Sequence, residues 1–149
     1  MSSKLKVRFK RQSYDYDCLP TCVYMILDYI GSPIEYEELL RLCKTDRYGT
    51  TLTEVAEALE KLGFSVKTVN MDLSDLIKHV RGGAPVIAFV DPYYFPWVKV
   101  HCSHSVVVVG VYEEGLTILD PLKGEKNCPF SVFLSAWRPF NNLVMLIAA

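Results

Sequence analysis

The segment from Cys18 to Ile30 is apolar on nearly all sides, and this feature constrains the fold most. Its large apolar side chains recur at positions that cover most of a helical surface: Val23, Met25, Ile26, Leu27 and Ile30. A helix that is hydrophobic all round has to be buried. Gly31 ends the pattern, and Pro33 follows shortly after it. We therefore predict a central helix that other elements cover on most sides.

The rest of the chain predicts helices first and strands second. The expected helices are 35–42, a segment that starts at the Thr51/Glu54 capping box and runs to 62, and a segment that Asp72 caps and that runs to 80. A strand at 64–69 lies between the last two. The later segments are expected to be strands at 85–90, 105–112, 116–119 and 143–147, with a helix at 130–137.

This order of elements is typical of the α+β class. We expect an N-terminal helical half, built around the central buried helix, that packs on a C-terminal antiparallel sheet. A length of 149 residues is typical of one domain, so residues 1–149 are predicted to form a single domain.

Charge and hydropathy exclude several classes of protein. The formal net charge is −1, whereas nucleic-acid-binding domains are usually strongly basic, so no nucleic-acid partner is expected. No apolar run approaches the roughly 18 residues of a membrane helix, which predicts no integral membrane segment. The bases that precede Asp15 alternate with Leu5, Val7 and Phe9. Lys4–Lys10 is therefore predicted to be an edge strand with a solvated basic face, and not a signal peptide.

The five cysteines are an odd number, and no C-x-x-C motif occurs among Cys18, Cys22, Cys43, Cys102 and Cys128. This pattern does not resemble a secreted disulfide framework, so a reduced, cytoplasmic protein is expected. It also raises the question of whether one cysteine is a nucleophile, with the other four in the core.

Cys18 is the candidate nucleophile because of its place at the start of the buried helix. Pro20 fits the first turn of a helix, where a missing N–H costs nothing. Free N–H groups and the positive end of the helix dipole favour a thiolate there and lower its pKa. The nearby carboxylates of Asp15 and Asp17 oppose this shift, although Asp17 is also a candidate helix cap.

A thiolate nucleophile needs an imidazole partner, and His104 at the head of a valine-rich strand is the best candidate. Asp120 is a candidate for orienting the imidazole. Both side chains are expected on the same face of the sheet. A simple hairpin centred on Glu114 pairs Asp120 with Val108, about 13 Å along the strand from His104. A β-bulge or strong coiling is therefore needed to bring the two together.

Metal binding is an alternative interpretation of the same residues. Cys18 and Cys22 lie one helical turn apart, and residues 101–104 read His-Cys-Ser-His. Structural zinc usually takes four ligands in a tetrahedron, whereas strand alternation places His101 and His104 on opposite faces. We therefore favour a site without metal or cofactor.

The motifs and their spacing resemble the bacteriocin-processing, double-glycine leader peptidases of the papain-like clan over nearly the whole chain. Family members read Gln, a few residues, and then Asp-Cys-Gly-x-Ala-Cys, which is similar to Gln12 and residues 17–22. Their His-(Phe/Tyr)-Val-Val-Val is similar to residues 104–108, and their Asp-Pro-x-x-Gly to residues 120–124. Further matches are Gly49-Thr50 through Phe64, the Pro-x-Ile strand at 85–87, and Phe133 through Trp137, and the order and spacing of all these pieces together are specific.

The resemblance implies a papain-like cysteine endopeptidase that cleaves a peptide or protein substrate through an acyl-enzyme intermediate. Cys18 would be the nucleophile, His104 the general base and then acid, and Asp120 the residue that holds the imidazole. Gln12, together with the Cys18 backbone N–H, would donate to the oxyanion. The family implies a double-glycine leader as substrate and association with a peptide exporter. No transporter follows in this sequence, so a freestanding domain is expected.

The sequence departs from the family pattern at two positions. Leu19 follows the nucleophile where the family usually has Gly, and Ser105 follows the histidine where an aromatic residue is usual. Two alternatives therefore stay open: a non-catalytic peptide-binding module on the same fold, and another papain-like amide hydrolase or acyl transferase. The aromatic run 93–97 either lines a substrate groove or packs on its own domain.

Overall fold

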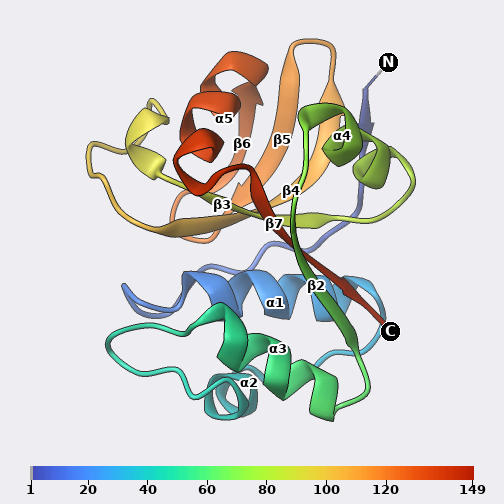
Figure 1. The fold of residues 1–149 in the computed structure, drawn as a ribbon, viewed down its shortest axis with the longest axis vertical. Helices are drawn as coiled ribbons and strands as arrows, with labels where there is room; N and C mark the ends of the chain where they lie inside the picture. Colours follow the sequence, from blue (N-terminus) through green and yellow to red (C-terminus); the bar gives the residue numbers. More distant parts are fainter. Residues whose placement is uncertain (1) are drawn as a thin grey trace.

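The central buried helix is α1 (Cys18–Tyr29), which lies against one face of a seven-stranded antiparallel sheet in the computed structural model of residues 2–149 (Figure 1). α2 (Tyr36–Leu42) and α3 (Leu52–Lys61) lie on the same side of the sheet as α1. α4 (Leu73–Arg81) and α5 (Phe130–Trp137) cover the opposite face. The predicted α+β architecture, with helices packed on an antiparallel sheet, is confirmed.

The strands run in the order β2-β7-β3-β4-β5-β6, and β1 pairs separately with β4. Their bounds are β1 Ser3–Lys4, β2 Ser65–Asn70, β3 Val86–Val90, β4 His104–Tyr112, β5 Gly115–Asp120, β6 Gly124–Pro129 and β7 Leu143–Ala148. Two short 3₁₀ helices follow β3 and α5, at Pro92–Tyr94 and Arg138–Phe140. The sheet therefore brings the start of β4 and the end of β5 to one edge of the molecule.

Helix starts follow the capping residues that the sequence predicts. The Thr51 hydroxyl accepts a hydrogen bond from the Glu54 N–H while the Glu54 side chain accepts one from the Thr51 N–H, and these two bonds form the capping box of α3. Asp72 accepts a hydrogen bond from the Asp75 N–H, at 2.8 Å, and so caps α4.

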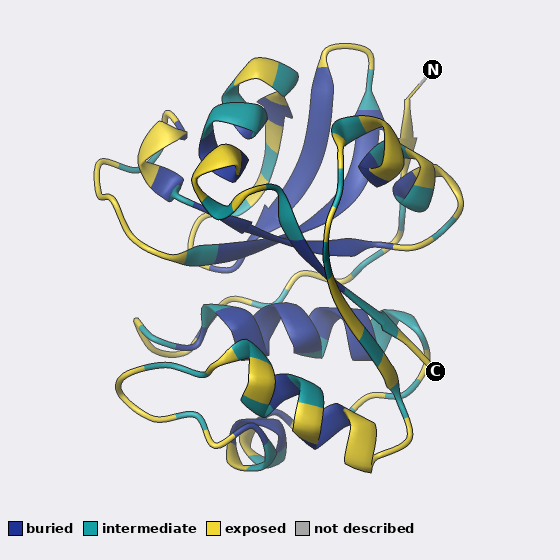
Figure 2. Ribbon diagram, in the orientation of Figure 1, coloured by how far each residue is buried: buried dark blue, intermediate teal, exposed yellow. Residues whose placement is uncertain are grey.

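The middle of the sheet is buried on both faces, as the dark blue strands in Figure 2 show. Val107 and Val109 of β4 pack in the core that contains α1, α2 and α3. Val106 and Val108 pack in the second core, with α4 and α5. Strand alternation therefore explains why β4 is almost continuously hydrophobic.

Two expectations about strands were wrong. β1 is only two residues long, because after the Leu5 N–H bonds the Val109 carbonyl the chain leaves the sheet, and the Val7 N–H bonds the Leu5 carbonyl instead. The bases between 4 and 11 mostly have partners on the same molecule. Lys4 pairs with Glu125 and Arg8 with Asp28.

The second error concerns β6, which the sequence did not predict. Its residues Gly-Glu-Lys-Asn-Cys-Pro are too polar to stand out by hydrophobic alternation. It pairs with β5 along its full length and forms an edge of the sheet. Among the helices of residues 2–149, none combines the length and the hydropathy needed to cross a bilayer.

Candidate active site

Cys18 is the first residue of α1, at the end of a tightly held loop. Asp17 occupies the N-cap position of α1, as the sequence suggests, but within residues 2–149 its carboxylate makes no capping hydrogen bond to the helix. It accepts hydrogen bonds from the backbone N–H groups of Ser13 and Tyr14 instead, each at 2.9 Å. Asp17 therefore holds the loop before the helix and leaves the helix N-terminus open toward Cys18.

A buried hydrogen-bond network ties this loop to α2. The Tyr36 hydroxyl donates to Asp17 Oδ2 at 2.5 Å, and the Thr21 hydroxyl donates to the Asp17 carbonyl at 2.7 Å. Burial and the bond to Asp17 raise the pKa of Tyr36 far above its ordinary value, so it stays a neutral donor. The backbone around Cys18 is thus fixed by groups that are satisfied in the core.

His104 and Asp120 meet at the edge of the sheet where β4 begins and β5 ends. Nε2 of His104 lies 2.9 Å from Oδ1 of Asp120, which is fully buried. The same Oδ1 accepts the Leu122 N–H at 2.9 Å and the Lys123 N–H at 3.3 Å. These bonds orient the carboxylate toward His104 and leave the other ring nitrogen, Nδ1, free for the thiol side.

The gap that a simple hairpin would leave between these residues is closed in two ways. The turn pairs Tyr112 with Gly115, and the register then shifts at a bulge between Val108, which pairs with Ile118, and Gly110, which pairs with Thr117. If the register of the Val108–Ile118 pair continues by two residues, Asp120 lies opposite position 106, whereas the simple hairpin would place it opposite position 108. The expected β-bulge is therefore present. The turn and the bulge each shift the register by one residue, and together they halve the separation along β4.

The electrostatics of Cys18 and His104 favour an ion pair. Burial raises the pKa of the Cys18 thiol, but hydrogen bonding to His104, its positive charge and bonds from Ser105 outweigh burial, so the pKa lies below its ordinary value. Burial lowers the pKa of His104, but Asp120 and Cys18 raise it to about 9. Burial also opposes ionisation of Asp120, yet His104 and the other donors hold its pKa below the ordinary value. Both shifts favour a thiolate next to an imidazolium over a neutral thiol next to a neutral imidazole.

Ser105 is a site residue that the sequence reasoning did not identify. It is buried beside Cys22, with Sγ 3.6 Å from its hydroxyl oxygen. Hydrogen bonding from its hydroxyl and backbone contributes to the lowered pKa of the Cys18 thiol. The available signal was a serine directly before a run of four valines in β4. Cys22 itself is fully buried, and burial raises the pKa of its thiol well above the ordinary value.

Gln12 is buried and anchored to the turn that follows Asp120. Its backbone N–H donates to the Pro121 carbonyl at 2.9 Å, and its Nε2 donates to the Tyr14 carbonyl at 2.7 Å. Its Oε1 is buried, with no hydrogen-bond partner among the described residues. The structure thus brings Cys18, His104 and Asp120 together and places Gln12 outside the lining of the adjoining pocket.

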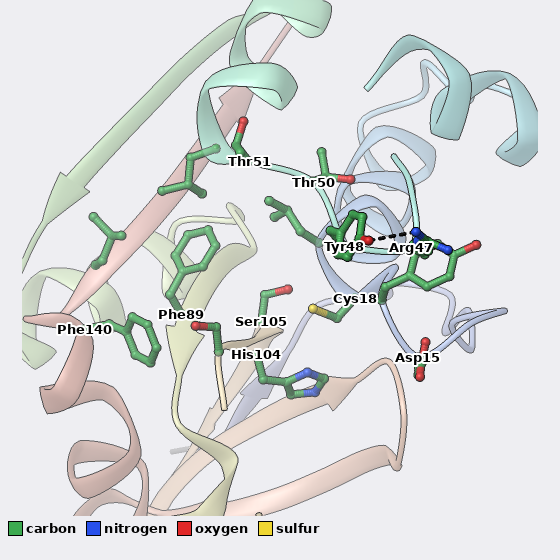
Figure 3. A pocket seen from close by; sticks show the side chains of 16 residues that line it. Asp15, Cys18, Arg47, Tyr48, Thr50, Thr51, Phe89, His104, Ser105 and Phe140 are labelled. Carbon is green, nitrogen blue, oxygen red and sulfur yellow. Dashed lines mark hydrogen bonds between the residues drawn. The ribbon is translucent and has the colours of Figure 1, made fainter. Parts of the chain in front are cut away.

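A pocket of about 530 Å³ opens next to Cys18 and His104 (Figure 3). One end is apolar and includes Phe89 and Phe140, and the other end carries Asp15, Arg47 and Tyr48. Leu19 also lines the pocket, but only 6% of it is exposed, because it packs in the core with α1. The residue that replaces the family glycine is therefore mostly a core residue.

The second histidine of the 101–104 segment lies in a separate cluster. Nδ1 of His101 lies 2.7 Å from Oδ2 of Asp91, and its ring stacks on Tyr93. Cys102 is exposed, so the expectation that it lies in the core was wrong. Within residues 2–149, no group of three or more His, Cys, Asp or Glu side chains is arranged to hold a metal ion.

An α+β fold with a thiol at a helix N-terminus and a histidine at the head of a central strand defines the papain-like class. A family model described as the Peptidase C39 family matches residues 6–148. The chain therefore belongs to the Peptidase C39 family, and the resemblance inferred from the motifs is confirmed.

Individual relatives agree with this family. An uncharacterized protein of Methanothermobacter marburgensis is 32% identical over 114 residues, which cover 76% of this chain and 71% of that protein. The peptidase domain of Streptococcus ComA, a bifunctional ABC transporter of a quorum sensing pathway, has a TM-score of 0.76 at 26% identity and covers 95% of this chain and 98% of its own. A double glycine motif protease from an AMS/PCAT transporter, solved in complex with the leader peptide, shares the fold, with a TM-score of 0.78 at 20% identity and coverage of 97% and 93%.

Proposed function

We propose that the chain is a cysteine endopeptidase that uses Cys18, His104 and Asp120. The observation that carries this proposal is the buried His104–Asp120 pair, at 2.9 Å, beside a thiol whose pKa lies below its ordinary value. A thiolate is the form that attacks carbonyl carbon. A merely structural cysteine needs no such neighbours.

The reaction proceeds in two halves. The Cys18 thiolate attacks the scissile carbonyl, and the charge that develops on its oxygen is met by the Cys18 backbone N–H and by the Gln12 amide. His104 then gives its proton to the leaving amine, which departs and leaves a thioester on Cys18. In the second half, a water molecule gives a proton to His104 and attacks the thioester, which releases the acid and restores the thiolate.

Asp120 keeps the imidazole in place through both proton transfers. Its bond to Nε2 directs Nδ1 toward the thiol and stabilises the imidazolium that accompanies the thiolate. Gln12 donates a hydrogen bond to the oxyanion when its amide, which here bonds the Tyr14 carbonyl, turns toward Cys18. Its buried Oε1, which lacks a partner within the described residues, supports an amide that changes its bonds when substrate arrives.

The substrate we propose is a peptide leader that ends in two glycines. The support is family membership and the two solved relatives, one of which is a double glycine motif protease in complex with its leader peptide. The pocket supports this too, since its apolar end and its polar end lie on either side of Cys18 and suit an extended peptide. Association with a peptide exporter is proposed on the same two relatives, both of which are parts of transporters.

Synthetic leader–cargo peptides test the proposal. The wild-type chain should cut a peptide with Gly-Gly at the junction after the second glycine, as mass spectrometry of the products would report. It should spare a matched peptide with Val-Val there, and Cys18→Ala should cut neither. Binding of the Gly-Gly peptide by the wild-type chain without any cleavage would overturn the proposal in favour of a peptide-binding module.

A further inference from the structure

Trp97 touches the proposed triad from a loop that the sequence motifs do not include. Its indole N–H donates to Oδ2 of Asp120 at 3.1 Å. It follows the 3₁₀ helix Pro92–Tyr94 and precedes β4, so it reaches Asp120 from the chain that leads into His104. The aromatic run was expected either to line a groove or to pack on its own domain, and this bond gives one member a more specific contact.

The two oxygens of the Asp120 carboxylate have different numbers of hydrogen-bond partners. Oδ1 contacts His104 Nε2 and accepts the N–H groups of Leu122 and Lys123. For Oδ2, Trp97 is the one donor that residues 2–149 supply. Asp120 is fully buried, and an ionised carboxylate oxygen without a donor is costly in such a place. The indole N–H therefore completes the solvation of the carboxylate by the protein.

The indole is itself held in position. Its ring stacks on Phe95, with centroids 4.7 Å apart and planes within 15°, and Phe95 is buried in the core with α4 and α5. The Lys126 ammonium lies 5.5 Å from the centroid of the same ring. A side chain fixed in this way can fix its partner, because its N–H points in one direction.

We propose that Trp97 is a positioning residue for the His104–Asp120 pair, an inference that rests on the proposed peptidase function. By holding Oδ2, it keeps Oδ1 turned toward Nε2 of His104 and keeps the carboxylate ionised. Without this donor, Asp120 takes up a proton at higher pH and the imidazole is less firmly held. The Cys18 thiolate then loses part of its support.

The chain offers a matched control, because it has two tryptophans. The indole N–H of Trp137 donates to the Leu143 carbonyl at 3.0 Å in a fully buried position. Trp97→Phe and Trp137→Phe thus each remove one indole donor and keep an aromatic ring. Only the first removes a donor from Asp120.

The measurement is the rate of Cys18 alkylation by iodoacetamide as a function of pH, with each cysteine followed by peptide mass spectrometry. Trp97→Phe should move the midpoint of the acid limb upward by about one pH unit, the equivalent of roughly one charge-assisted hydrogen bond. Trp137→Phe should leave the midpoint unchanged, even where it lowers the melting temperature. Leader cleavage by Trp97→Phe should lose kcat about tenfold with little change in KM.

The outcomes separate this inference from the proposed function. If Asp120→Asn moves the midpoint of Cys18 alkylation and Trp97→Phe does not, the role of Trp97 is overturned and the proposed function is not. A midpoint that neither variant moves would overturn the triad as well. NMR gives a second readout, the indole N–H resonance of Trp97, which is the one that persists in Trp137→Phe. This resonance should shift between the unsubstituted protein and Asp120→Asn. An unshifted resonance would contradict the bond between Trp97 and Asp120.

Discussion

Nε2 of His104 and Oδ1 of Asp120 lie 2.9 Å apart, and a bulge next to Gly110, where β4 carries one residue more than β5, supplies half of the register shift that brings them together. The bulge also reverses the alternation of side chains. Val109 packs in the core with α1, and Val111 packs in the opposite core. β1 covers this point, since Lys4 pairs with Gly110 and the Leu5 N–H bonds the Val109 carbonyl. A short N-terminal strand thus stabilises the geometry of a distant pair of side chains.

Gly110→Ala is expected to disturb that geometry. A Cβ atom at Gly110 would lie 2.8 Å from the Ser3 carbonyl oxygen and 3.1 Å from Thr117 Cβ, so β1 or the bulge has to move. Overpacking of this kind costs about 1–3 kcal/mol of unfolding free energy. Chemical denaturation should show this loss, and Cys18 alkylation at neutral pH should slow. A variant as stable and as reactive as wild type would contradict the importance of this contact.

The sequence predicted the fold and the three residues that meet at the candidate site for identifiable reasons. Strong periodicity and capping residues marked α1, α3, α4 and α5, and the motifs singled out Cys18, His104 and Asp120. β6 was missed because its side chains are mostly polar and show no hydrophobic alternation, although its partner β5 directly precedes it in the sequence. Trp97 and Ser105 were missed because their partners become neighbours only when the strands assemble. The position of the bulge between Val108 and Gly110, and so the register of β4 with β5, could not be read from the sequence either, because it depends on how the strands pair.

The pH dependence of peptide cleavage should show two limbs, and that of Cys18 alkylation should show the first limb alone. Alkylation should rise with pH at a midpoint below the ordinary thiol pKa, because His104 holds the pKa of Cys18 down. The imidazolium should persist until about pH 9, because Asp120 and Cys18 raise the pKa of His104 to about 9. Peptide cleavage, which needs thiolate and imidazolium together, should therefore fall again above that pH.

His104→Ala tests the cause of the low Cys18 pKa. Burial opposes ionisation of the thiol and is then no longer outweighed by the imidazole, so the midpoint should move above the ordinary value. Cys128, whose thiol has a pKa raised to about 12 by burial, is the internal reference and should label slowly in both proteins. Equal labelling of Cys18 in both would show that His104 does not support the thiolate.

Ser105→Ala should weaken the thiolate without removing the imidazole. The hydroxyl of Ser105 contacts Cys22, and hydrogen bonding from it lowers the pKa of Cys18, so its loss should raise that pKa. We expect the alkylation midpoint to rise by less than in His104→Ala, because the backbone bond from Ser105 remains. Ser103→Ala is the matched control, since Ser103 also lines the pocket. A shift of the same size in both variants would indicate a general effect of the pocket wall.

Tyr36→Phe should show how far the buried network behind Cys18 supports the site. The substitution removes the hydroxyl that donates to Asp17 Oδ2 and contacts Thr21, and it leaves both groups buried with one partner fewer. An unsatisfied buried polar group costs about 1–3 kcal/mol, so the free energy of unfolding should fall by a similar amount.

Tyr24→Phe is the control, because Tyr24 packs edge-on against Tyr36 in the same cluster. Because Asp17 also holds the N–H groups of Ser13 and Tyr14, leader cleavage should fall in Tyr36→Phe and stay near wild type in Tyr24→Phe. Equal losses in both variants would show that the loss is not specific to the hydrogen bond between Tyr36 and Asp17.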